Sequence, residues 1–197
     1  MGLIRRNAEP EQLQYASIPD LLRQLDDPDR DVRREAALGL DGVAVAVGPL
    51  LDRVAAEPVP AVRDAMLTTL AAHDIGRVAE RLAVLLASDD AGLRTAAAEA
   101  LATMPLATPA IIPRLLTNYD HDVRVMTAMV LANLRHPAAL TWLAEMIRDD
   151  PHPNVVAAAV DALLPSVGPE HAELLQQAVR RFPDDPFLRF TIEAALR

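Results

Sequence analysis

The chain has 197 residues, no cysteine and a formal net charge of −9 at pH 7. The absence of cysteine excludes disulfides, thiolate metal sites and cysteine catalysis, and the negative charge argues against a surface that binds nucleic acid. About half of the residues are hydrophobic but only 3% are aromatic, so a core must consist of Ala, Leu and Val. Such a composition favours closely packed helices over a β-sandwich.

We expect no myristoylation or export signal in the first residues of the sequence. Arg6 stands where a myristoylation signal requires Ser or Thr, and the residues after it are polar, unlike the apolar segment of an export signal. No apolar run approaches the roughly 18 residues of a membrane span. We therefore expect a cytoplasmic protein that does not contact membranes. Residues 1–16 are expected to form an N-terminal cap on a domain that spans residues 17–197.

One sequence phrase then recurs six times along the chain. Its copies are DRDVRREAALGL (29–40), PAVRDAMLTTL (60–70), AGLRTAAAEAL (91–101), DHDVRVMTAMVLANL (120–134), PNVVAAAVDAL (153–163) and PFLRFTIEAAL (186–196). The aligned positions are separated by 30, 31, 30, 32 and 33 residues, and they are Arg33, Arg63, Arg94, Arg124, Val156 and Arg189. A period this regular is typical of a repeat protein.

Each repeat is predicted to be a helix, a short turn and a second helix. Within the phrase the apolar residues follow the spacing i, i+4, i+7 and i+8, which is one stripe of an amphipathic helix. A second apolar segment precedes each copy, and turns rich in Asp, Asn and Pro join the two. Stacked helix pairs share a continuous core. The predicted repeats span residues 17–46, 47–76, 77–107, 108–136, 137–168 and 169–197.

The acidic turn followed by Val-Arg-x-x-Ala-x-x-Ala-Leu resembles the HEAT repeat. The period of about 30 residues is similar to that of the short variety called phycobilisome-lyase HEAT-like, and the resemblance covers residues 18–196. It implies an all-α fold, a right-handed α-solenoid of about six helix pairs. It specifies little about function, because the family includes cofactor lyases, hydroxylases, proteins that bind DNA lesions and many adaptors.

The arginine of the phrase and the aspartate two residues before it form a predicted structural ladder. A residue that recurs once per repeat more often holds repeats together than forms an active site. The resemblance implies that the aspartate caps the second helix and that the arginine bridges to the next turn. Val156, which replaces the arginine, indicates either a weaker joint or a place where a ligand approaches. The ladder comprises Asp31, Arg33, Arg63, Arg94, Asp122, Arg124 and Arg189.

No catalytic residue, metal ligand or cofactor is predicted. The five histidines show no i, i+4 pairing, and the His-Glu dipeptide that ligates metal in the HEAT-repeat hydroxylases is missing. A glycine-rich phosphate loop and a local Ser/His/Asp set are missing as well.

The partner-binding residues are predicted on the second helices, which line the concave face in HEAT-like solenoids. Positions i+2, i+3 and i+6 of the stripe should point away from the core. In the fourth repeat all three are apolar, and acidic Glu99 and Asp161 flank them. Either the flexible methionines dock a partner helix, or the register is off by one residue and they belong to the core. The predicted residues are Arg34, Leu38, Asp64, Thr68, Thr95, Glu99, Val125, Met126, Met129 and Asp161.

The predicted function is that of a non-catalytic protein–protein interaction module, an adaptor or regulatory scaffold that binds a helix or peptide of another protein. The alternative, from the resemblance to bilin lyases, is a subunit that attaches or chaperones a tetrapyrrole. Acidic groups would then hold the pyrrole nitrogens, and Asp64, Glu99 and Asp161 are available. DNA binding is disfavoured because the HEAT-like glycosylases carry a basic concave face. The oligomeric state stays open.

Overall fold

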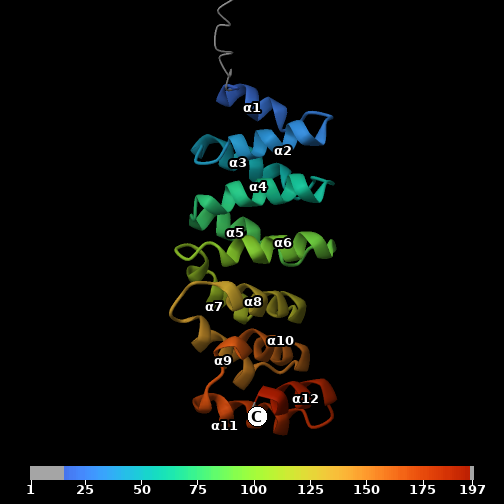
Figure 1. Ribbon diagram of the computed structural model, residues 1–197, viewed down its shortest axis with the longest axis vertical. Coiled ribbons are helices and arrows are strands. Elements are labelled where there is room, and N and C mark those ends of the chain that lie inside the picture. The colour runs from blue at the N-terminus through green and yellow to red at the C-terminus, as the bar shows by residue number, and fades with distance from the viewer. Residues whose placement is uncertain (1–15, 196–197) are drawn as a thin grey trace, which may run out of the picture.

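The computed structural model describes residues 16–195, and this part of the chain contains helices and turns but no strand (Figure 1). Within these residues, twelve α-helices form six consecutive pairs stacked along the long axis of the molecule. They are α1 (Ile18–Gln24), α2 (Arg30–Gly39), α3 (Val47–Arg53), α4 (Pro60–Ala72), α5 (Gly76–Leu85), α6 (Ala91–Ala102), α7 (Ile112–Leu116), α8 (His121–Asn133), α9 (Ala139–Asp149), α10 (Pro153–Leu163), α11 (Ala172–Arg181) and α12 (Pro186–Ala195). The predicted all-α solenoid of six helix pairs is confirmed. The predicted cap lies outside the described residues, apart from its last residue, Ala16.

The stack has two layers, and its contacts follow the order of the chain. The second helices of the pairs pack in sequence, α2 on α4, α4 on α6, α6 on α8, α8 on α10 and α10 on α12. In the other layer α3 contacts α5 and α9 contacts α11. The buried core between the layers consists mainly of Ala, Leu and Val. Small side chains let neighbouring helices approach closely, so the low aromatic content suits this architecture.

The second helices begin at a capping residue four positions before the aligned arginine. The carboxylates of Asp29, Asp90 and Asp120 accept hydrogen bonds from backbone N–H groups in the first turns of α2, α6 and α8, which stabilises the start of a helix. The expected caps were Asp31 and Asp122, but both lie exposed in the first turn, where their own N–H groups donate to the true caps.

Two turns depend on a left-handed backbone. Gly42 has a φ of +70° in the turn after α2, a conformation that glycine adopts without a steric penalty. Asp74 has a φ of 42° after α4, and its carboxylate accepts hydrogen bonds from the N–H groups of Leu106 and Ala107 at 3.0 and 2.9 Å. This aspartate therefore ties the end of the second repeat to the loop after α6, at the end of the third repeat.

None of the helices between residues 16 and 195 is both long enough and apolar enough to cross a membrane.

Candidate functional site

The predicted ladder lies along the edge of the stack where the turns between paired helices meet. Arg33 is buried and donates to both carboxylate oxygens of Glu57 in the next repeat, from Nε at 3.0 Å and from Nη2 at 2.8 Å. Its Nη1 donates to the carbonyl oxygens of Asp27 and Pro28 in its own turn. One side chain therefore closes its own turn and fastens the following repeat to it.

Two further arginines bridge neighbouring repeats. Arg63 Nη1 lies 2.6 Å from Asp90 Oδ2. Arg124 donates to both oxygens of buried Asp150, from Nε at 2.6 Å and from Nη2 at 3.1 Å, and its Nη1 donates to the carbonyl of Asn118 at 2.7 Å. The sequence reading did not identify the acidic partners Glu57 and Asp150, because it treated their segments as turn formers only.

At the remaining ladder positions the arginine bonds only within its own turn, or a valine stands in its place. Arg94 donates to the carbonyl of Ser88, and Arg189 donates to the carbonyl of Pro183. Val156 is buried in the core. At this joint Arg181 of the last repeat reaches back instead, and it donates to the carbonyl oxygens of Ile147 at 2.8 Å, of Arg148 and of Asp150. The absence of an arginine at position 156 therefore does not leave this joint without a bridge.

The ion pairs of the ladder stabilise the charged forms of their members. Burial raises the pKa of Glu57, but hydrogen bonds from Arg33 and from the N–H of Val59, together with nearby Arg53, outweigh this effect and leave the pKa below its usual value. The hydrogen bond from Arg63 is the main cause of the lowered pKa of Asp90. Hydrogen bonds to Glu57 and Asp150 raise the pKa values of Arg33 and Arg124 respectively.

Most of the predicted partner-binding residues lie on the surface of the second-helix layer. Six of them are exposed, and four are half-buried. The exposed residues are Arg34, Leu38, Asp64, Thr68, Glu99 and Asp161, and the half-buried residues are Thr95, Val125, Met126 and Met129.

A groove between α4 and α6 brings three of these residues together. It has a volume of about 400 Å³, and its walls include Asp64 and Thr68 from α4 and Glu99 from α6. Small side chains open it: Ala71, Ala72, Ala96 and Ala100. The hydroxyl of Thr68 donates to the carbonyl of Asp64 within its own helix. Among residues 16–195, Asp64 and Glu99 form no ion pair, so the groove presents two uncompensated negative charges.

Val125, Met126 and Met129 are half-buried on α8 and pack against the core. The stripe residues Val123 and Val130 of the same helix are buried, so the predicted register of α8 is right. The three residues lie beside the core-facing stripe and are partly covered by the neighbouring helices. They match neither of the two expectations fully, since they are neither free on the surface nor inside the core.

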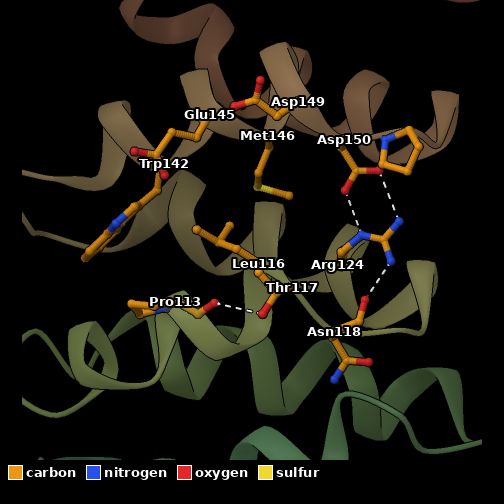
Figure 2. A pocket seen from close by; sticks show the side chains of 11 residues that line it. Pro113, Leu116, Thr117, Asn118, Arg124, Trp142, Glu145, Met146, Asp149 and Asp150 are labelled. Carbon is orange, nitrogen blue, oxygen red and sulfur yellow. Dashed lines mark hydrogen bonds and ion pairs between the residues drawn. The ribbon is translucent and has the colours of Figure 1, made fainter.

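A second cavity lies in the layer of the first helices, between α7 and α9 (Figure 2). It has a volume of about 590 Å³. Apolar walls come from Pro113 and Leu116 of α7 and from Trp142 and Met146 of α9, and the Arg124–Asp150 pair borders it. The sequence reading missed this cavity. The one feature of the sequence that could have indicated it is Trp142, the only tryptophan of the chain.

The described part of the chain contains no group of three or more His, Asp or Glu side chains that could hold a metal ion. Two histidines from neighbouring repeats, His121 and His152, stack with ring centroids 3.9 Å apart, but no third ligand accompanies them there.

Residues 108–197 match the family model for HEAT repeats. The resemblance drawn from the repeated phrase is thereby confirmed for this part. No match was found among curated proteins.

Several solved structures resemble the chain at low identity. The complex of CpcE and CpcF of phycocyanin lyase from Nostoc sp. PCC7120 is 19% identical over 100% of this chain and 81% of the other, with a TM-score of 0.48. Human deoxyhypusine hydroxylase in complex with glycerol is 20% identical over 91% and 83%, with a TM-score of 0.42. A designed armadillo repeat protein in complex with the peptide (KR)4 is 17% identical over 92% and 98%, with a TM-score of 0.41. These likenesses are too distant to transfer an activity, a ligand or a partner.

Proposed function

We propose that this chain is a non-catalytic protein–protein interaction module, an adaptor or regulatory scaffold, and that it binds a basic helix or peptide on the face of its second helices. The observation that carries the proposal is the groove between α4 and α6. Asp64 and Glu99 line it, both are exposed, and neither forms an ion pair within residues 16–195.

The chemistry of this face indicates the kind of partner that suits it. Its alanine walls allow another chain to approach closely, and its two carboxylates attract basic groups and repel acidic ones. Helix α8 packs directly on α6 and carries the half-buried Met126 and Met129. Flexible methionines adapt to an apolar anchor. A partner that combines Lys or Arg with Leu or similar residues on one helix face therefore fits best.

The composition of the chain makes a direct test simple, because the sequence contains no lysine. A carbodiimide reagent joins a carboxylate to an amine, so it links a lysine-containing peptide to the protein with little competition from amines of the protein itself. The probe is a synthetic helix that carries Leu and Lys together on one face and neutral polar residues on the other. We expect cross-links at Asp64 and Glu99, identified by mass spectrometry after digestion.

A matched pair of variants then measures the contribution of the groove. The double variant Asp64→Asn/Glu99→Gln removes two charges from it, and Asp41→Asn/Asp89→Asn removes two charges from exposed turns. We expect the first to weaken binding of the labelled peptide roughly tenfold, about 1.4 kcal/mol, and the second to change it less than twofold. Equal binding by both variants would refute the proposal. A natural partner is sought as a protein that co-purifies with the wild type and the control but not with the groove variant.

The tetrapyrrole alternative makes a different forecast for the same residues. The groove brings Asp64 and Glu99 together but does not include Asp161. If the groove holds a tetrapyrrole, adding biliverdin to the protein produces a shifted absorption band that the Asp64→Asn/Glu99→Gln variant loses. An unchanged biliverdin spectrum together with peptide binding favours the adaptor.

A further inference from the structure

The cavity between α7 and α9 combines an apolar wall with an excess of negative charge. Trp142, Leu116 and Met146 contribute apolar surface. The ring of His136 stacks on the Trp142 indole, with centroids 5.2 Å apart and planes within 7°, which restrains the indole. Figure 2 shows Trp142 among the side chains that line the cavity. A preorganised aromatic wall of this kind is suited to binding because less motion is lost when a ligand arrives.

The charges that border the cavity are unbalanced. One guanidinium, that of Arg124, stands among the three carboxylates of Glu145, Asp149 and Asp150. Arg124 is occupied by Asp150 through two hydrogen bonds at 2.6 and 3.1 Å, and both side chains are buried. Glu145 and Asp149 are exposed and form no ion pair among the described residues. Two negative charges on the rim of the cavity are therefore available to a ligand.

An aromatic wall beside free carboxylates favours a planar cation. A guanidinium stacks on an indole and pairs with a carboxylate through two parallel hydrogen bonds, whereas an ammonium is a compact and strongly hydrated point charge. The volume of about 590 Å³ falls in the usual range for ligand pockets. It is large enough for one arginine side chain and parts of the residues next to it in the bound chain. We propose that this cavity receives an arginine side chain of a protein partner, with its guanidinium against Trp142 and paired with Glu145 or Asp149.

This site is independent of the groove between α4 and α6. It is formed by the first helices α7 and α9, by the turns after them and by Arg124 of α8, and it shares no lining residue with that groove. The two proposals can therefore fail separately.

Trp142 provides the readout, since it is the only tryptophan of the chain and lines the cavity. The full chain is titrated with the peptide acetyl-Leu-Arg-Leu-amide, and its tryptophan fluorescence is recorded. Matched peptides carry citrulline, which has the shape of arginine without its charge, or lysine. We expect a saturable change with the arginine peptide, binding at least tenfold weaker with citrulline, and binding several-fold weaker with lysine.

Three variants separate the sites. Glu145→Gln/Asp149→Asn is expected to weaken the arginine peptide at least fivefold. Asp41→Asn/Asp89→Asn, which removes the same charge elsewhere, and Asp64→Asn/Glu99→Gln, which alters the groove, are expected to leave the titration unchanged. Equal binding of the citrulline or the lysine peptide, the absence of a saturable change, or an effect of the control variants as large as that of Glu145→Gln/Asp149→Asn overturns the proposal. Circular dichroism of each variant verifies that the helices are intact.

Discussion

Replacing Arg124 by alanine tests the ladder most directly, because Arg94 provides a matched control. Both arginines occupy the same position of their repeats, and each donates to a carbonyl of its own turn, 2.7 Å to Asn118 and 2.6 Å to Ser88. Only Arg124 also pairs with an acid of the next repeat, Asp150. The difference between the two substitutions therefore reports mainly on the cross-repeat pair, together with the greater burial of Arg124.

The structure gives the expected magnitudes. Removing one member of a buried ion pair costs about 3–5 kcal/mol, because the other charge stays buried without its partner. Asp150 keeps a hydrogen bond from the N–H of His152 at 2.9 Å, so we expect the low end, about 3 kcal/mol, for Arg124→Ala. The single hydrogen bond lost in Arg94→Ala is expected to cost about 1 kcal/mol. The two variants should therefore differ by about 2 kcal/mol in their free energies of unfolding.

Urea unfolding followed by circular dichroism measures this difference. With a dependence of roughly 2–3 kcal/mol/M for a chain of this size, Arg124→Ala should lower the midpoint by about 1 M. The double variant Arg124→Ala/Asp150→Asn should be more stable than Arg124→Ala alone, since it no longer buries an unpaired charge. If Arg124→Ala and Arg94→Ala lower the free energy of unfolding equally, the pair does not couple the repeats. The same conclusion follows if the double variant loses the sum of the losses in Arg124→Ala and Asp150→Asn.

Three further predictions concern charge, packing and the stacking of repeats. The pKa of Glu57 in the folded protein lies below its usual value, so the ionised side chain stabilises the fold above the unfolded pKa of about 4.3, and this contribution is lost as the pH falls through the folded pKa. The urea midpoint of the wild type should therefore fall between pH 6 and 3, and Glu57→Gln should reduce this fall. Met126→Gln/Met129→Gln should cost about 2 kcal/mol in unfolding free energy, half the value for two fully buried methionines, and a loss beyond about 4 kcal/mol would place both in the core. Removing residues 169–197 should leave a soluble protein that is less stable and associates more in gel filtration, since each repeat depends mainly on its neighbours; complete unfolding would instead indicate one indivisible core.

The fold was predictable because the sequence repeats it. Each copy of the phrase places apolar residues on one stripe, and the structure buries them, as Leu93, Ala97 and Leu101 illustrate. The position of the capping residue could also have been predicted from the sequence. DRDVR and DHDVR offer an aspartate at two positions, but SDDAGLR has Asp90 four residues before its arginine and glycine two residues before it. A comparison of the copies would have indicated the earlier position.

The cavity and the acidic partners were less accessible from sequence, for a physical reason. The Trp142 cavity is formed by two first helices, their turns and Arg124 of α8, and the distance between those helices is set by packing rather than by local pattern. Asp150 follows a second aspartate, Asp149, in the same turn, and only the folded chain determines which of them is buried against Arg124. The half-buried state of Met129 likewise depends on how closely α6 and α10 approach α8.

The separation of charges between the ladder and the helix faces links stability to recognition. In the ladder, buried arginines are neutralised by Glu57, Asp90 and Asp150 at the turn edge. Both candidate surfaces instead expose carboxylates that are free of ion pairs within residues 16–195, Asp64 and Glu99 on one layer and Glu145 and Asp149 on the other. Exposed charges contribute little to folding but strongly affect the rate and selectivity of association. Substitutions at the turn edge should therefore change the unfolding midpoint, while neutralising the exposed acids should change the binding of basic partners and its dependence on salt.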